Sequence, residues 1–557
     1  MKNISTRKFA STYTHSSALY RAAFAALVIA AAPTNSAWAL PTGGVVNGGS
    51  ATITQPDANN LVINQTSNRA IIDWRSFNIL NGESTRFNQP GANSVALNRI
   101  HDGNPSQILG SLSANGKLVL VNPNGVFFGA GSRVDVSALV ASTANISNDD
   151  FMAGRTNFNI AGRPDASIIN KGTITAAEGG LVALVAPSVR NDGVIQARAG
   201  AIRIGAADTF TVDFYGDNLY SFALGSKAVK AGKDENGNDL TSAVENNGTL
   251  SAQGGSIMLT ANAAKDIVTH AVNNTGVIEA TSARMVNGTI VLGGGEGNVR
   301  VAGKVNASGK NAGEKGGSIT VTGNSIELAG ADIDASGSIG GGSVKIGGDY
   351  QGGGDLQRAE TVWVDERSLI NVSALDSGNG GTAIVWSDDA TTFAGSILGT
   401  GENGGFAEVS GKNTLEFSGF ADLHATSATG TTGTLLLDPT NITIGPILAA
   451  ASELILNTGT DLTFFTPAEG TDAGNITVLS AINWSGSGSL VLNAINNIIV
   501  ANSITSSFAG VGGNVTLTAG NNVQIGANGS NGGNGTNGLN AFLAANGLNG
   551  LNASNDT

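Results

Sequence analysis

A short unit that recurs along the chain beyond residue 165 is the feature that most constrains the fold. An Asn-x-Gly element flanked by β-branched or apolar residues appears four times, in 168–174, 189–195, 244–250 and 272–278. A Gly-Gly-Ser element recurs as well, at 254–256, 316–318 and 341–343. The first two Asn-x-Gly elements lie 21 residues apart and the last two Gly-Gly-Ser elements lie 25 residues apart. Such spacing is typical of a β-solenoid with about 20–30 residues in each coil.

The physical reason for this interpretation is burial. Each unit contains one or two short strands that cannot bury their apolar face alone. Stacking the coils about 4.8 Å apart pairs their backbones and produces one continuous core. Asn and Gly supply the corners, because such turns require left-handed backbone conformations. A set of β-sandwiches with Asn-Gly hairpins is the alternative.

Other stretches refine this picture. From 42 to 143 short apolar runs alternate with Asn/Gly turns, and no segment there has a 3.6-residue apolar period of helical length. The stretch 207–240 interrupts the repeat and is predicted to form a loop or hairpin outside the solenoid. The stretch 447–524 is predicted to continue with short strands.

The amino-acid composition excludes some classes of binding partner and of chain. The formal net charge is −13, which argues against nucleic acid and anionic lipid. Charged residues make up 13% of the chain, against about 25% in typical globular proteins. The 79 glycines are accompanied by only 11 prolines, so a proline-rich disordered chain is not indicated. There is no cysteine. Either the chain needs none, or disulfides would hinder its passage through a narrow pore.

Residues 1–39 have the features of an export signal. An apolar stretch at 22–32 precedes Ala37-Trp38-Ala39, an A-x-A cleavage site, so the mature chain is predicted to begin at Leu40. The apolar stretch is too short to span a bilayer stably. The basic residues before and around it are Lys2, Arg7, Lys8 and Arg21.

A tight turn is predicted at Asn122-Pro123-Asn124-Gly125, between the apolar segments 117–121 and 126–128. Pro123 presets φ at the second position, Asn124 tolerates the third, Asn122 can cap its own backbone, and Gly125 accepts the exit geometry.

The turn and its surroundings resemble the secretion domain of two-partner-secretion exoproteins, the filamentous-haemagglutinin family. The resemblance rests on several motifs in one order, namely 72–79, 87–90, 96–100, 106–110, 122–129 and 134–143. Segments 382–388, 404–411 and 434–439 resemble the passenger region of the same family. A second Asn-Pro element precedes the main one in some members, and only Asn104-Pro105-Ser106 could correspond to it here.

The resemblance implies an all-β fold, a right-handed parallel β-helix with an N-terminal cap and extra-helical hairpins. It also implies export across the outer membrane by a partner β-barrel transporter, with the N-terminal domain as the secretion address. The turn at Asn122, Pro123, Asn124 and Gly125 is then the candidate secretion motif, which shapes the cap region and has no catalytic role. The predicted domains are a signal peptide (1–39), a two-partner-secretion domain (40–305, motif core 70–143), passenger repeats (306–527) and an Asn/Gly triplet tail (528–557). The tail is expected to be disordered, with an extended polyproline-II-like strand that neighbouring chains would order as the alternative. The frame of its triplets suggests a truncated form of a longer exoprotein.

Candidate catalytic groups are sparse. The four histidines, His15, His101, His270 and His424, are scattered, and none lies among other ligand types at metal-ligand spacing. A His101, Asp102 and Ser106 triad lacks a nucleophile-elbow motif. The pairs Asp365-Glu366 and Asp388-Asp389 are interpreted as solvated coil corners. No enzymatic activity, cofactor or metal is therefore predicted.

The predicted role is adhesion by a secreted or surface-exposed protein of a Gram-negative bacterium, associated with the outer membrane. Its expected partners are the transporter and a host-cell, glycan or cell-surface receptor. A toxin or cytolysin exported by the same route, or a β-helix enzyme acting on polysaccharide, is the alternative. An autotransporter is not favoured, because no run of alternating aromatic barrel strands ends the chain.

Overall fold

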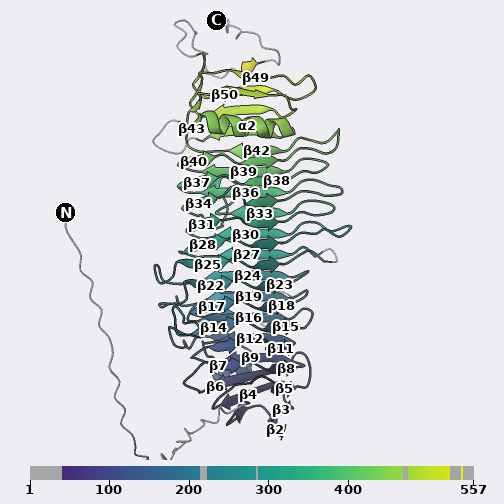
Figure 1. The fold of residues 1–557 in the computed structure, drawn as a ribbon, viewed down its shortest axis with the longest axis vertical. Coiled ribbons are helices and arrows are strands. Elements are labelled where there is room, and N and C mark those ends of the chain that lie inside the picture. Colours follow the sequence, from purple (N-terminus) through teal and green to yellow (C-terminus); the bar gives the residue numbers. More distant parts are fainter. Residues whose placement is uncertain (1–39, 214–221, 284–285, 468–473, 527–540, 544–557) are drawn as a thin grey trace, which may run out of the picture. The chain divides into compact units, whose positions relative to one another are not determined.

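Most coils of the fold contain a strand from each of three sheets, and successive coils stack so that equivalent strands pair in parallel (Figure 1). The computed structural model describes residues 40–213, 222–283, 286–467, 474–526 and 541–543, which belong to the unit Ala39–Thr557. The predicted signal peptide, and the triplet tail apart from 541–543, lie outside the described residues. The prediction of a parallel β-helix is confirmed.

Sheet 1 runs through the whole stack. In the described residues it has 18 strands. They are β1 (Val45–Gly48), β4 (Arg69–Trp74), β6 (Val95–Ile100), β9 (Lys117–Val121), β12 (Ala138–Ser142), β16 (Leu181–Ala186), β19 (Ala201–Ala206), β24 (Ser256–Ala261), β27 (Thr289–Gly293), β30 (Ser318–Thr322), β33 (Ser343–Ile346), β36 (Thr382–Ser387), β39 (Phe406–Gly411), β42 (Thr434–Leu437), β44 (Asp461–Thr466), β47 (Leu490–Ala494), β50 (Val515–Ala519) and β52 (Ala541–Leu543).

In most coils, a strand of sheet 2 and then a strand of sheet 3 follow the strand of sheet 1. Sheet 2 consists of β7 (Ser106–Ile108), β10 (Val126–Phe128), β14 (Ser167–Asn170), β17 (Ser188–Asn191), β22 (Ser242–Asn246), β25 (His270–Asn274), β28 (Asn298–Val301), β31 (Ser325–Leu328), β34 (Thr361–Val364), β37 (Ala390–Phe393) and β40 (Thr414–Phe417). Sheet 3 consists of β2 (Ala51–Asp57), β3 (Asn60–Gln65), β5 (Ser84–Asn88), β8 (Ser111–Ala114), β11 (Arg133–Val136), β15 (Thr173–Ala176), β18 (Val194–Gln196), β23 (Thr249–Ser251), β26 (Val277–Glu279), β29 (Lys304–Asn306), β32 (Asp332–Asp334), β35 (Leu369–Asn371), β38 (Ser396–Leu398) and β41 (Phe420–Asp422).

The core consists of rows of apolar side chains that point inward at the same register position in successive coils. In sheet 3, Ile174 lies opposite Ile195, which in turn lies opposite Leu250, and all three side chains are fully buried. Burying one such side chain stabilises the fold by about 1.5–3 kcal/mol. Because strand pairing continues from β29 to β32, the stack runs through the domain boundary predicted at 305.

The Asn-x-Gly repeats form a buried ladder. Asn170, Asn191, Asn246 and Asn274 lie in register at the ends of four consecutive sheet 2 strands, and none is exposed. Each of the first three donates from Nδ2 to Oδ1 of the next, over 2.7, 2.8 and 2.7 Å. The repeat therefore satisfies the polar groups of one buried corner along the stack.

Antiparallel strands cap the described stack. β1 pairs antiparallel with β4, and β2 pairs antiparallel with β3, so both cover the first parallel strands of their sheets. At the other end β52 pairs antiparallel with β50. Such covers block edge-to-edge association of exposed strands.

A helix corrects the expectation of strands alone after residue 447. Helix α2 (Pro446–Thr458) follows β43 (Ile442–Ile444) and lies between β41 and β46 (Ile482–Trp484), in the place of a sheet 3 strand. Pro446 occupies the first turn, and Gly459, with φ 96°, ends the helix. The apolar run 447–456 is short enough to suit a strand or a helix, which explains the wrong prediction.

The remaining strands complete the C-terminal coils and a side sheet. β43, β45 (Ile476–Val478), β48 (Asn497–Val500) and β51 (Asn522–Ile525) pair in parallel, as do β46 and β49 (Ile504–Ser506). β20 (Phe210–Val212) pairs antiparallel with β21 (Phe222–Leu224) and with β13 (Asn157–Phe158), forming the expected extra-helical hairpin. Helix α1 (Asn148–Ala153) precedes β13, and its N-cap Ser147 accepts a hydrogen bond from the Asp150 N–H.

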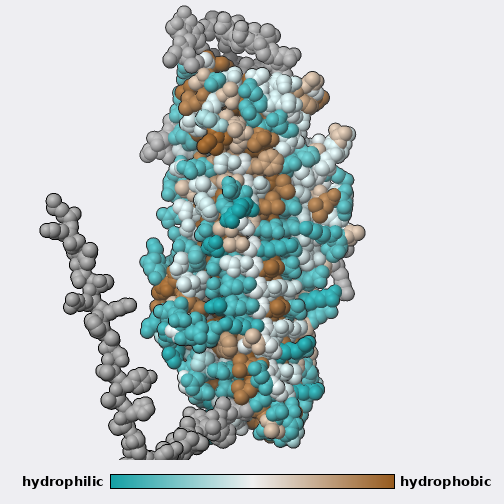
Figure 2. Space-filling view, in the orientation of Figure 1, coloured by the Kyte–Doolittle hydropathy of each residue, from teal (hydrophilic) through white to brown (hydrophobic). Residues whose placement is uncertain are grey.

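The visible surface is mostly hydrophilic, and apolar side chains gather over the coils near α2 (Figure 2). Ile447 and Leu454 of α2 are 71% and 60% exposed. Among the described residues, neither helix has the length and apolar character that a membrane span requires.

Candidate secretion site

The four-residue turn predicted at Asn122–Gly125 connects β9 of sheet 1 with β10 of sheet 2. The Gly125 N–H donates to the Asn122 carbonyl oxygen at 2.9 Å, which closes the turn. The Asn124 N–H donates to Oδ1 of Asn122 at 2.9 Å, so Asn122 caps its own backbone. Pro123 occupies the second position, where its ring fixes φ.

The turn is attached to the preceding coil through Asn122, which is fully buried. Its Nδ2 donates to the Asn104 carbonyl oxygen and to Oγ of Ser106, both at 3.0 Å. Nδ2 of Asn124 donates to the Asp102 carbonyl oxygen at 2.7 Å. The second Asn-Pro element, Asn104-Pro105-Ser106, therefore lies directly against the main turn.

The following coil leaves no room beside Gly125. Its φ is +111°, and a Cβ added there would lie 2.4 Å from the carbonyl oxygen of Ser167. The Arg163 N–H donates to the Pro123 carbonyl oxygen at 2.9 Å. The turn is thus held between two coils, and glycine is required by both backbone conformation and space.

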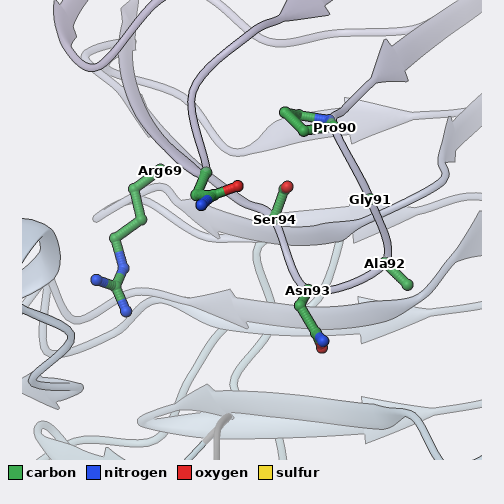
Figure 3. A pocket seen from close by; sticks show the side chains of 7 residues that line it. Arg69, Pro90, Gly91, Ala92, Asn93 and Ser94 are labelled. Carbon is green, nitrogen blue, oxygen red and sulfur yellow. The ribbon is translucent and has the colours of Figure 1, made fainter.

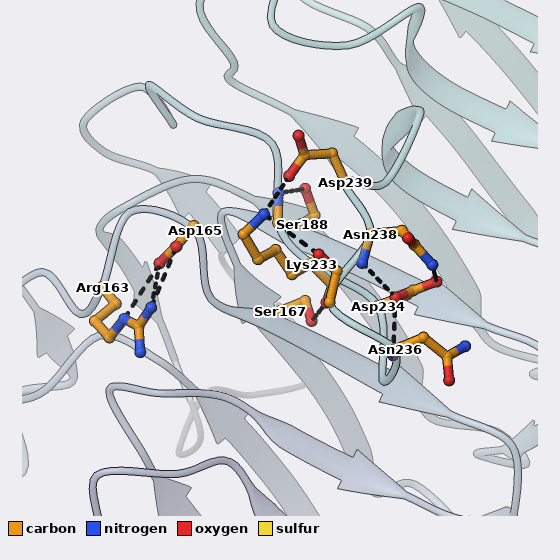
Figure 4. Close-up of polar contacts among 11 residues, drawn as sticks. Arg163, Asp165, Ser167, Ser188, Lys233, Asp234, Asn236, Asn238 and Asp239 are labelled. Carbon is orange, nitrogen blue, oxygen red and sulfur yellow. Dashed lines mark hydrogen bonds and ion pairs between the residues drawn. The ribbon is translucent and has the colours of Figure 1, made fainter.

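The loop 225–241 supports this second coil from outside (Figure 4). The Lys233 N–H donates to the Asp165 carbonyl oxygen at 3.1 Å, and the Ser167 hydroxyl donates to the Lys233 carbonyl oxygen. Oδ1 of Asp234 accepts hydrogen bonds from the backbone N–H groups of Asn236, at 2.9 Å, and Asn238, at 2.8 Å. Hydrogen bonds from Asn238 hold the pKa of Asp234 below its usual value. The polar stretch therefore has a structural role in holding the coil that follows the turn.

A shallow pocket of about 430 Å³ lies near the N-terminal cap, lined by 68–69 and 90–94 (Figure 3). Its charged residue is Arg69, at the start of β4. Nη1 of Arg69 donates to the Met152 carbonyl oxygen at 3.1 Å and so ties β4 to α1. The pocket offers no set of convergent groups for chemistry.

The predicted first residue of the mature chain, Leu40, is anchored in the cap. Its side chain is 2% exposed, and its backbone nitrogen lies 3.0 Å from Oε2 of Glu83. Ala39, on the other side of the predicted cleavage point, lies outside the described residues.

His101 and Ser106, which were considered for a catalytic triad, have different hydrogen-bond partners, and the other described histidines lie elsewhere in the fold. Nε2 of His101 contacts Oδ1 of Asp73 at 3.1 Å, whereas Oγ of Ser106 accepts from Asn122. Nδ1 of His424 contacts Oδ1 of Asp422 at 2.6 Å, and burial lowers the pKa of His270. His15 lies outside the described residues.

The acidic pairs lie at coil corners, but Asp365 is buried, at 7% exposure, where a solvated corner was expected. Burial raises the pKa of Asp365, but hydrogen bonds from Ser368, Gly330 and Arg367 outweigh it and hold the pKa below its usual value. Asp388 pairs with Arg358 at 3.1 Å, and Asp389 accepts from Asn413. Within the described ranges, no three His, Cys, Asp or Glu side chains gather in a way that could hold a metal ion.

Comparisons with known proteins agree with this architecture. The TPS secretion domain family matches residues 37–307. The solved HMW1 secretion domain of Haemophilus influenzae is 32% identical, with a TM-score of 0.61, and the match covers 72% of this chain and all of that one.

Two heme/hemopexin-binding proteins of Haemophilus influenzae are also similar. One is 29% identical over 287 residues, or 49% of this chain and 30% of that protein. The other is 27% identical over 262 residues, or 44% of this chain and 27% of that protein. This chain therefore spans less than a third of the length of these relatives. With the shared coils and the full coverage of a solved secretion domain, the chain belongs to the two-partner-secretion exoproteins and carries their TPS secretion domain.

Proposed function

We propose that this exoprotein is an adhesin, a surface-interaction protein exported across the outer membrane of a Gram-negative bacterium by a partner β-barrel transporter. It acts at the cell surface or after release. The secretion domain supports the export route, and the contact function belongs to the coils beyond it. The feature that carries the proposal is a polar groove on three successive loops of these coils.

The groove has a volume of about 440 Å³ and is lined by 379–382, 403–406, 431–432 and Thr434. Nδ2 of Asn403 donates to Oδ1 of Asn379 at 2.7 Å, and the Thr431 hydroxyl donates to Oδ1 of Asn403 at 3.1 Å. These amides and hydroxyls are therefore aligned from coil to coil. The ring of Phe406 packs edge-on against Tyr350, 5.8 Å between centroids, and Tyr350 is 50% exposed.

This combination suits a glycan. Sugar hydroxyls pair with amide and hydroxyl groups, and the apolar face of a sugar ring packs against an exposed aromatic ring. The groove is open, so it can accept one unit of a longer chain. A host-cell or cell-surface glycan is accordingly the proposed receptor.

The turn Asn122–Gly125 is proposed as part of the secretion address, without a catalytic role. Its support is the way in which two coils and the loop 225–241 hold it in one conformation. A mispositioned turn alters the first coils that form when the chain emerges. Each coil needs mainly its neighbour, so an error there affects every later coil.

Binding of heme or hemopexin is a second candidate, which rests on the similarity to the two heme/hemopexin-binding proteins of Haemophilus influenzae. A cytolysin and a polysaccharide-degrading β-helix enzyme are the further alternatives. They differ from an adhesin in a measurable product, either released cytoplasmic content or shortened polysaccharide.

The decisive experiment uses the secreted protein purified after co-expression with its transporter. Binding to a glycan array and to epithelial cells is compared for the wild type and Thr432→Arg, which places a bulky cation in the groove. Thr241→Arg is the matched control, because it alters another exposed threonine outside the groove. Loss of binding in Thr432→Arg alone supports the proposal. Equal binding by both variants, or binding to hemin or hemopexin alone, contradicts it.

A further inference from the structure

A buried carboxylate in the N-terminal cap faces the first residue of the predicted mature chain. Oε2 of Glu83 accepts from the Leu40 nitrogen at 3.0 Å and from the Leu80 N–H at 2.7 Å. Glu83 is 8% exposed, and no Lys, Arg or His among the described residues forms an ion pair with it. A buried carboxylate without a cation is costly, so the partner missing here is a positive charge.

Leu40 has a backbone that suits a chain terminus. Its φ is +66°, in the left-handed region that residues with a Cβ rarely adopt. The strain of that region comes from contacts between Cβ, the side chain and the carbonyl group of the preceding residue. Hydrolysis between Ala39 and Leu40 removes that carbonyl group from Leu40, and the strain is lost with it.

We propose that Glu83 forms a binding site for the free α-ammonium group of Leu40, and that signal-peptide cleavage creates this ligand. Water adds across the Ala39–Leu40 peptide bond, which leaves a carboxylate on Ala39 and, with the proton, an ammonium group on Leu40. An amide that donates one hydrogen bond is thereby replaced by a cation beside a buried carboxylate. The proposal is independent of what the passenger coils bind.

The position of Leu40 and Glu83 connects signal-peptide cleavage to folding of the N-terminal cap. Two residues beyond Leu40, the Thr42 N–H donates to the Ser76 carbonyl oxygen, and the Arg75 N–H donates back to Thr42, both at 2.9 Å. This antiparallel pairing continues into β1, which covers the edge of β4. Glu83 lies in a turn closed by its own N–H on the Leu80 carbonyl oxygen at 3.0 Å. The ammonium group therefore locks the cap onto the first coil only after cleavage.

The test compares four secreted proteins, whose N-termini are verified by intact mass. They are the wild type, Glu83→Gln, a form with Gly-Ser inserted between Ala39 and Leu40, and the combination of both changes. We expect a lower urea midpoint for unfolding in each single variant and little further loss in the combination. Loss of the carboxylate in Glu83→Gln is expected to lower the pKa of the α-amine by about one unit or more. Its acetylation rate at neutral pH should then rise about tenfold or more, because more of the amine is unprotonated.

Glu178→Gln is the control, because Glu178 is an exposed acid in a turn after β15. Circular dichroism establishes that each variant is folded before acetylation is compared. Additive losses in the midpoint, or equal acetylation rates in wild type and folded Glu83→Gln, overturn the proposal. If Glu83→Gln is not secreted, the Gly-Ser insertion alone decides: a urea midpoint equal to that of the wild type overturns the proposal.

Discussion

The side-chain amide of Asn122 donates to the hydroxyl group of Ser106 at 3.0 Å, across the boundary between two coils. Both residues are buried, at 0% and 3% exposure. The same amide nitrogen reaches the Asn104 carbonyl oxygen, so one side chain joins the two Asn-Pro elements of the domain. The turn is therefore a junction between coils as well as a local reversal.

Asn122→Ala is expected to destabilise the mature chain by about 1–3 kcal/mol, because it leaves buried hydrogen-bonding groups of the neighbouring coil without a partner. Asn124→Ala is the matched control. Asn124 is partly exposed, so water can replace its lost hydrogen bond to the Asp102 carbonyl oxygen. Urea unfolding of the refolded chain measures both losses. Equal losses would show that burial of Asn122 does not matter.

Gly125→Val is expected to reduce export strongly. A residue with a Cβ at φ +111° costs about 1–3 kcal/mol in strain alone, and the Cβ also meets the Ser167 carbonyl oxygen at 2.4 Å. Gly131→Val is the control, since Gly131 has φ +85° but nothing within 4 Å of an added Cβ. The measurement is extracellular protein after co-expression with the transporter. Normal export of Gly125→Val would remove the turn from the secretion address.

Asn191→Val is expected to cost about 2–3 kcal/mol, because it breaks the asparagine ladder in the middle. Nδ2 of Asn170 loses its Asn191 acceptor, and Oδ1 of Asn246 loses its Asn191 donor. Asn274→Val should cost less. Asn274 ends the ladder, and the next residue in register is already Val301. Denaturant midpoints of the two variants test the difference. A larger loss in Asn274→Val would mean that the ladder is not the unit of stabilisation.

Stability is expected to fall as the pH rises from about 4.5 to about 7, through Glu408. Burial raises the pKa of Glu408 to about 7, the Gln351 N–H and the Ser410 hydroxyl oppose the shift, and Asp438 and Asp349 add to it. Because this folded-state pKa lies above the unfolded value, the folded chain binds more protons in that window. The contribution of Glu408 to stability is therefore fully present below pH 4.5 and is lost as the pH rises to about 7, by about 3 kcal/mol.

Glu408→Gln should remove most of this pH dependence, because the amide cannot ionise. Glu416→Gln, at an exposed position of β40, should leave it intact. Urea unfolding at pH 5 and pH 8 checks both variants. An unchanged pH dependence in Glu408→Gln would place its source elsewhere in the chain.

Much of the fold could be predicted because its information is local and repeated. The spacing of Asn170 and Asn191 is one coil length, and the alternation of apolar residues in Thr173–Ala176 determines which side chains point inward. The turn at Asn122–Gly125 also follows from its own residues, since Pro and Gly restrict the backbone regardless of context. Parallel stacking then requires only that each coil meet the next.

Tertiary structure alone decided what these local elements contact. No spacing rule indicated that Asn122 would donate to Asn104 and Ser106, although two Asn-Pro dipeptides 18 residues apart were a usable signal. The helical state of 446–458 was likewise decided by packing between β41 and β46, because its apolar run satisfies either periodicity. The pairing of Leu40 with Glu83, 43 residues away, depends on how the cap folds back onto the first coil. Backbone preferences act within a few residues, whereas burial of a charge or an amide depends on groups that only the folded chain brings together.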